Sequence, residues 1–212
     1  MSESASAFEA LRRLQEGNAR FVTGEGTRDL SLEHLRRMEL LANQAPFAII
    51  LGCSDSRVPA EMVFDQGLGD LFVIRVAGNI VAPSQVGSIE FAAERFGVRL
   101  VVVLGHSECG AVQAALEERE RPSKNRSPNL DLILRCILPG AEAAAASIGT
   151  QDREALMDCA VRNNIRASAE HLRRGSDVLE KLIRDNGLLI GGAEYSLETG
   201  VVEFFDGVSA TG

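Results

Sequence analysis

Three short apolar runs, separated by long polar segments, constrain the fold of this 212-residue chain more than any other feature. The runs cover residues 47–51, 71–76 and 100–104, and a helical pattern over residues 84–96 lies between the last two. Strands buried on both faces are continuously apolar, and parallel neighbours need a long connection that is usually a helix. The sequence therefore predicts an α/β fold with a central, mainly parallel β-sheet flanked by α-helices.

Helical spacing of apolar residues also predicts two amino-terminal helices, over residues 8–21 and 32–41. No repeat, low-complexity tract or linker divides the chain. We expect a single domain over residues 1–212, with an amino-terminal helical arm over about residues 1–42.

The carboxy-terminal half reads as helices followed by a hairpin. Helices are expected over residues 110–120, 130–147, 153–173 and 177–186. Pro139 and Gly140 are expected to kink or split the second of these helices. Apolar runs at 188–190 and 201–205 flank a turn signal around Gly200, which predicts a carboxy-terminal hairpin or edge strand.

Charge and cysteine content exclude several classes of protein. A formal net charge of -8 without clusters of Lys and Arg disfavours binding to nucleic acid or to an anionic membrane. The first twenty residues lack the apolar stretch of a secretory signal, and no run approaches transmembrane length. Four unevenly spaced cysteines indicate metal chemistry in a reducing compartment rather than a disulfide framework, so we expect a cytoplasmic protein.

Two cysteines and one histidine fall directly after predicted strands. Cys53 follows the first apolar run, and His106 and Cys109 follow the third. Ligands of open α/β sheets bind at the carboxyl ends of strands, so these side chains can converge on one metal. Three protein ligands are typical of catalytic zinc sites, which leave a fourth position for water or substrate, and this favours a hydrolytic or hydrating enzyme. The alternative is a buried cysteine pair with an unrelated histidine.

Four motifs spread over nearly the whole chain carry a family resemblance. They are LQEGNARF at 14–21, CSDSRV at 53–58, GHSECG at 105–110 and GAEYSLETG at 192–200. In these motifs the chain resembles the β-class carbonic anhydrases of the bacterial or plant-like subgroup, zinc enzymes that interconvert carbon dioxide and bicarbonate. The resemblance implies one Zn²⁺ per chain as cofactor.

By this resemblance Cys53, His106 and Cys109 are the zinc ligands, and Asp55 and Arg57 form a catalytic hydrogen-bonded pair beside the metal. A carboxylate held by Arg57 can orient a zinc-bound hydroxide toward substrate. If the pair breaks, Asp55 can itself become the fourth zinc ligand in a closed, inactive state. A purely structural role for this ion pair is the alternative interpretation.

The resemblance also implies a substrate pocket, residue by residue. Gln44 would donate a hydrogen bond to a substrate oxygen, and the backbone N–H of Gly110 would stabilise developing negative charge. Phe72, Ala77 and Phe91 match apolar wall positions, with Phe91 where the family often has tyrosine. Gln44 could equally be an ordinary loop residue, and the three apolar residues could equally be core.

The function implied is reversible hydration of carbon dioxide to bicarbonate and a proton, by attack of zinc-bound hydroxide. One alternative is a hydrolase of carbonyl sulfide or carbon disulfide on the same scaffold, and another is a non-catalytic scaffold or sensor stabilised by zinc. The expected partner is the small-molecule substrate, with neither nucleic acid nor membrane. The resemblance implies a homodimer or homotetramer.

Overall fold

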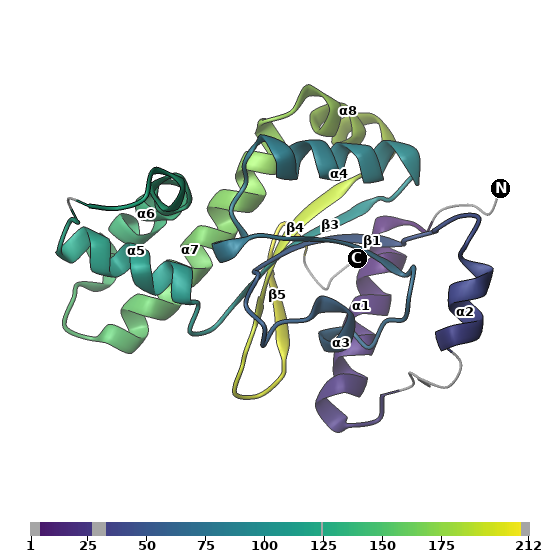
Figure 1. Cartoon of the computed structure of the whole chain (residues 1–212), viewed down its shortest axis with the longest axis horizontal. Helices are drawn as coiled ribbons and strands as arrows, with labels where there is room; N and C mark the ends of the chain where they lie inside the picture. The colour runs from purple at the N-terminus through teal and green to yellow at the C-terminus, as the bar shows by residue number, and fades with distance from the viewer. Residues whose placement is uncertain (1–4, 27–32, 124, 209–212) are drawn as a thin grey trace.

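The computed structural model describes residues 5–26, 33–123 and 125–208. Its centre is a five-stranded sheet with the order β2-β1-β3-β4-β5 (Figure 1). The strands are β1 (Ala48–Gly52), β2 (Leu71–Arg75), β3 (Leu100–His106), β4 (Leu189–Tyr195) and β5 (Val202–Asp206). The first four are mutually parallel, and β5 runs antiparallel to β4. The predicted mainly parallel α/β sheet with a carboxy-terminal hairpin is confirmed.

Helices cover both faces of the sheet and extend beyond it (Figure 1). One face carries α1 (Ala7–Thr23) and α3 (Ala60–Val63), and the other carries α4 (Pro83–Arg95) and α8 (Asp177–Asn186). A helical lobe at one end of the sheet is built from α5 (Gly110–Glu120), α6 (Pro128–Ile148) and part of α7 (Arg153–Arg174). The remaining elements are α2 (Glu33–Glu39) and the 3₁₀ turn η1 (Ala77–Asn79).

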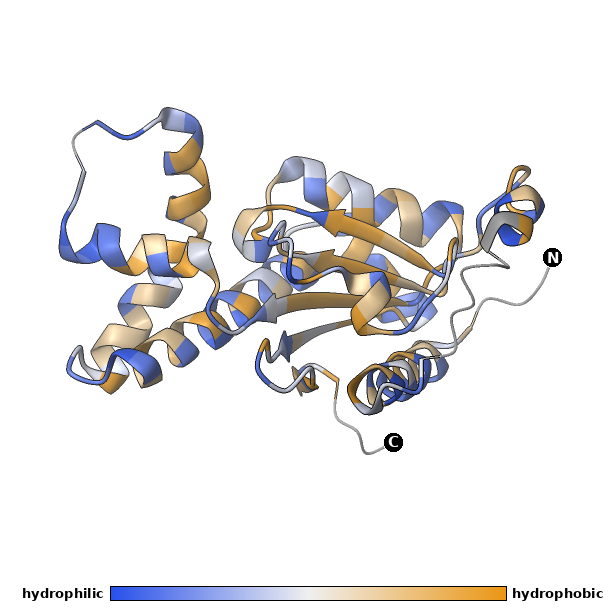
Figure 2. Cartoon of the chain, turned by 60° about the horizontal axis from the view of Figure 1, so that its bottom comes forward, coloured by the Kyte–Doolittle hydropathy of each residue, from blue (hydrophilic) through white to orange (hydrophobic). Residues whose placement is uncertain are grey.

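The core forms as two apolar clusters, one on each face of the sheet. All seven residues of β3 are buried, and successive side chains point to opposite faces. Val101 and Val103 pack with α4 to α8, whereas Val102 and Leu104 pack with α1 and α3. Burial on both sides explains why the inner strands are continuously apolar, as their orange colour in Figure 2 shows.

The register of the sheet fixes which loops meet. Gly52, at the carboxyl end of β1, pairs with Arg75 of β2 and with Leu104 of β3. His106 ends β3 and pairs with Tyr195 of β4. The segments that follow β1, β2 and β3 therefore emerge at one edge of the sheet, next to the helical lobe.

Of the two outcomes expected for Pro139 and Gly140, a kink or a split, the structure excludes the split of α6. The helix runs continuously over Pro128–Ile148 with Pro139 inside it. A proline in a helix leaves the carbonyl of the residue four positions earlier without its N–H donor. That residue is Arg135, which is exposed, so water can satisfy its carbonyl.

Strand β4 is longer than the apolar pattern predicts, and glycines are the reason. Gly191 and Gly192 interrupt the pattern because neighbouring atoms approach their backbone too closely for a side chain. A Cβ atom on Gly191 would lie 2.6 Å from Val208 Cγ2, and one on Gly192 would lie 2.7 Å from Ile165 Cγ2. The short elements α3 and η1 were not predicted, and residue 32, the expected start of the second helix, lies outside the described residues.

Within the described ranges, no helix combines the length and apolar character needed to cross a bilayer.

Candidate metal centre

Cys53 is the first residue after β1, and its thiol is held by the turn that follows β2. The side chain is buried, and the backbone N–H of Gly78 in η1 donates to its Sγ atom at 3.4 Å. Gly78 adopts φ 68°, a left-handed conformation that glycine tolerates without strain. A hydrogen bond from a backbone N–H favours the thiolate form that binds metals.

His106 is fully buried at the end of β3, and its ring is oriented by the backbone. Its Nδ1 atom lies 2.8 Å from the carbonyl oxygen of Ser107. A carbonyl only accepts hydrogen bonds, so Nδ1 carries the proton and Nε2 is left with a free lone pair. Nε2 is buried and finds no hydrogen-bond partner among residues 5–26, 33–123 and 125–208, as expected for a ligand atom that a metal satisfies.

Cys109 precedes the first residue of α5 and is also buried. Backbone N–H groups of Val112 and Ala111 favour its thiolate form, because the start of a helix has unsatisfied donors. Glu108, the residue before it, adopts φ 55°, which is uncommon for a side chain of this kind. Arg57 Nη2 donates to the Glu108 carbonyl oxygen at 3.3 Å and helps to hold this conformation.

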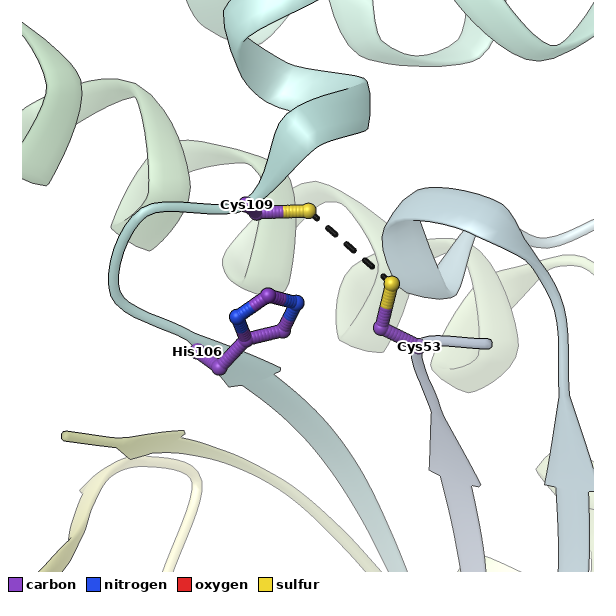
Figure 3. Close-up of side chains that lie close together, drawn as sticks. All are labelled: Cys53, His106 and Cys109. Atoms are coloured by element: carbon purple, nitrogen blue, oxygen red, sulfur yellow. Dashed lines mark hydrogen bonds between the residues drawn. The ribbon is translucent and has the colours of Figure 1, made fainter. Parts of the chain in front are cut away.

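The three ligand atoms lie within 4.8 Å of one another and converge from two strand ends and one helix start (Figure 3). The two Sγ atoms are 4.0 Å apart. The hydrogen bond between them lowers the pKa of Cys53 and raises the pKa of Cys109, which burial raises further. Two thiol groups and one imidazole, all buried, form a donor set that suits Zn²⁺.

Asp55 and Arg57 form a bidentate ion pair beside this cluster. Arg57 Nε donates to Asp55 Oδ1 at 2.9 Å, and Nη2 donates to Oδ2 at 2.7 Å. These hydrogen bonds hold the pKa of the Asp55 carboxyl well below its usual range. Asp55 Oδ2 also lies 3.9 Å from His106 Nε2, so an ionised carboxylate faces the ligand atoms while Arg57 holds it.

Arg75 fixes the backbone that carries both groups. Its Nε atom donates to the carbonyl oxygen of Cys53 at 2.9 Å, and Nη2 donates to that of Asp55 at 2.5 Å. Asn164, a buried residue of α7, donates to the carbonyl oxygen of Gly78 at 2.8 Å. The sequence motifs do not indicate this supporting role of Asn164 or Gly78, because only the tertiary structure brings these residues to the ligands.

The predicted pocket residues are not members of the cluster of three metal ligands. Gln44 is exposed before the amino end of β1, whereas Cys53 follows its carboxyl end. Phe72 lies in β2, and its ring centroid is 6.3 Å from that of Phe91, which is 53% exposed. Ala77 in η1 comes directly before Gly78, which holds the Cys53 thiol. Gly110 begins α5 and directly follows the ligand Cys109.

The site is a buried Cys₂His cluster at the carboxyl ends of parallel strands, next to the Asp55 carboxylate that Arg57 holds. These features define a class of zinc proteins with three protein ligands. A family model described as carbonic anhydrase matches residues 48–202. "Carbonic anhydrase 2" of Mycobacterium tuberculosis is 38% identical over 192 residues, which cover 90% of this chain and 89% of that protein. The chain belongs to the carbonic anhydrase family.

Solved structures agree with this assignment. A β-carbonic anhydrase of Aspergillus fumigatus matches with a TM-score of 0.73 and 28% identity, covering 84% of this chain and 85% of that one. A structure titled as one of two tetrameric β-carbonic anhydrases of Sordaria macrospora matches with a TM-score of 0.68 and 27% identity, covering 80% and 85%. The resemblance to the β class is thus confirmed.

Proposed function

We propose that this protein is a zinc-dependent carbonate dehydratase that reversibly hydrates carbon dioxide to bicarbonate and a proton. The observation that carries the proposal is the meeting of Cys53, His106 and Cys109 within 4.8 Å, with the Asp55 carboxylate 3.9 Å from His106 Nε2. Family membership and the donor set both support zinc as the resident metal. The three side chains would hold one Zn²⁺ per chain.

Zinc, when bound, supplies a Lewis acid that makes water a nucleophile near neutral pH. Two thiolates offset much of the charge of the metal, so orientation of the nucleophile by the protein matters more here than beside three neutral imidazoles. Asp55 is ionised and acceptor-only, and Arg57 fixes its direction. Its role is to accept a hydrogen bond from the attacking group and so aim that group's lone pair at the carbon of carbon dioxide.

The remaining pocket assignments extend this proposal. The N–H of Gly110, at the first position of α5, has no acceptor within its helix and can stabilise negative charge on the substrate oxygen. Gln44, Phe72, Ala77 and Phe91 stay predicted substrate contacts. The pairing of Asp55 with Arg57 supports an open arrangement over one in which Asp55 is the fourth metal ligand.

A stopped-flow assay of zinc-replete protein tests the proposal. We expect acceleration of carbon dioxide hydration that increases from neutral to alkaline pH, as the proton of the nucleophile is lost. Hydrogen sulfide release from carbonyl sulfide and carbon disulfide, measured on the same sample, distinguishes the alternative hydrolase. If the zinc-loaded protein did not accelerate carbon dioxide hydration at any pH, the proposed function would be wrong.

We further propose a cytoplasmic homodimer or homotetramer built from one domain per chain over residues 1–212. Large apolar side chains of the amino-terminal helical arm are exposed in the single chain, including Phe8 at 60% and Leu41 at 74%. Burying them against a second copy would remove apolar surface from water. Light scattering that gives the mass of a monomer at micromolar concentration would contradict the assembly.

A further inference from the structure

The hydrogen bond that orients His106 depends on Ser107. The Ser107 carbonyl oxygen accepts from His106 Nδ1, so its position decides where Nε2 points. Two further hydrogen bonds fix Ser107 itself. Its backbone N–H donates to the carbonyl oxygen of Tyr195 at 3.0 Å, and its side-chain Oγ accepts from the backbone N–H of Leu197 at 3.0 Å.

Tyr195 and Leu197 both belong to the hairpin formed by β4 and β5. Several hydrogen bonds hold the turn of this hairpin in place. Ser196 Oγ accepts from the N–H of Thr199 at 3.2 Å, and the Ser196 carbonyl accepts from Gly200 at 2.9 Å. The buried Asn18 of α1 donates to the Gly200 carbonyl at 2.8 Å. Ser107 thus connects the metal ligand His106 to the β4–β5 hairpin, which is held in place by its own hydrogen bonds.

We propose that Ser107 is a positioning residue for the metal centre, and that its hydroxyl holds the carbonyl that selects the tautomer and direction of His106. The inference rests on the proposed zinc site and deepens it. Without the hydroxyl, one of the two bonds to the hairpin is lost, and the His106 ring gains freedom to turn. Zinc binding should weaken although no ligand is removed.

The geometry separates this role from a general contribution to folding. Ser107 and Leu197 both line a cavity of about 680 Å³, and both are only partly buried. If Ser107 loses its hydroxyl, water in the cavity can accept the hydrogen bond from the Leu197 N–H. The chain should therefore fold normally without the hydroxyl, and the loss should appear at the metal.

Three variants test the proposal, with zinc affinity measured by competition with a chromophoric chelator. Ser107→Ala should weaken zinc binding roughly 10–100-fold, the range found for groups that orient metal ligands. Ser107→Thr, which keeps an Oγ atom, should restore affinity. Ser196→Ala is the matched control, because it removes a hydroxyl from the same turn, while the Ser196 carbonyl and Asn18 still hold the turn and both hydrogen bonds to Ser107 remain. Absorption of the Co²⁺-substituted proteins should change only for Ser107→Ala.

Unchanged affinity and spectrum in Ser107→Ala, or an equal loss in Ser196→Ala, would overturn the proposal. These readouts need no turnover, so a protein that binds zinc but hydrates no carbon dioxide would defeat the proposed function and leave this inference standing. A measurement on the wild type avoids variants altogether. Long-range ¹H–¹⁵N correlation spectra of the zinc-loaded protein should show a protected proton on His106 Nδ1, and a freely exchanging one would contradict the inference.

Discussion

Asp55 pairs with Arg57 at 2.7 Å, and its Oδ2 atom lies 3.9 Å from His106 Nε2. Hydrogen bonds from Arg57 lower the folded-state pKa of Asp55 below its unfolded value of about 3.9. A lowered pKa means that the pair stabilises the fold above the unfolded value and loses this effect as pH falls through the folded one. Changes in activity near neutral pH therefore do not arise from protonation of Asp55.

Asp55→Asn keeps the shape of the side chain and removes its charge. We expect carbon dioxide hydration to fall about 10²–10⁴-fold, the usual range for a group that handles a proton, while zinc content stays near one per chain. Stopped-flow assays with metal analysis measure both quantities. Asp152→Asn is the control, because this residue caps α7 and Asn caps helices equally well. Wild-type rates in Asp55→Asn would contradict the proposed role.

Gly78 supports Cys53 and has no room for a side chain. A Cβ atom there would lie 2.6 Å from Ile137 Cδ1 and 3.1 Å from Ala111 Cβ. Gly78→Ala should lower the free energy of unfolding by about 2–4 kcal/mol, from a left-handed conformation and from overpacking. Gly187→Ala has the same φ of 68° in open space, so it should cost only about 1–2 kcal/mol.

Urea unfolding of both variants in the same metal state measures this difference. The comparison isolates the packing around the Cys53 loop, since conformational strain is common to the two positions. Equal losses of stability at Gly78 and Gly187 would show that the side chains around Gly78 adjust freely.

Helix α1 and the hairpin of β4 and β5 are joined by one buried side chain. Asn18 donates to the carbonyls of Val63 and Gly200 and accepts from the N–H of Val202. Removing it leaves three backbone groups, one in α3 and two in the hairpin, without partners, at about 1–3 kcal/mol for each group that water cannot reach. Asn18→Ala should therefore destabilise the protein by several kcal/mol, as measured by urea unfolding.

Asn43→Ala is the matched control for this variant, because Asn43 is exposed in the loop before β1. It should change stability by less than about 0.5 kcal/mol. If the Asn18→Ala protein were as stable as the Asn43→Ala protein, the proposed role of Asn18 in holding α1 to the hairpin would be wrong.

Elements with a strong hydrophobic pattern could be predicted from the sequence. The apolar run at 100–104 predicts β3 because a strand with two covered faces needs apolar residues throughout. Elements that depend on close contacts between distant parts of the chain could not be predicted in this way. Gly191 and Gly192 are unfavourable in a strand, and only the approach of Val208 and Ile165 explains their place in β4.

The same distinction applies to the metal centre. Cys53, His106 and Cys109 stand at strand ends, so topology alone brings them together. Ser107 lies inside the GHSECG motif without being a metal ligand, and its role depends on the hairpin that follows much later in the chain. Supporting residues of this kind are set by tertiary hydrogen bonds, which leave no periodic signal in the sequence.

For the molecule as a whole, zinc binding should be linked to proton release. The hydrogen bond between Cys53 Sγ and Cys109 Sγ, which are 4.0 Å apart, needs a proton, so we expect the metal-free pair to keep one thiol proton. Zinc needs both thiolates, so about one proton should leave per metal bound. Calorimetric titration in buffers with different ionisation enthalpies measures this number. Release of no proton at pH 7 would show that both thiols are already ionised.

The central claim is that Cys53, His106 and Cys109 hold one zinc ion and leave one coordination position to a light atom. X-ray absorption at the zinc edge of the purified protein tests it most directly. We predict two sulfur atoms at roughly 2.3 Å and two nitrogen or oxygen atoms at roughly 2.0–2.1 Å, one of them with imidazole scattering. A shell of four sulfur atoms, or one without sulfur, would contradict the account.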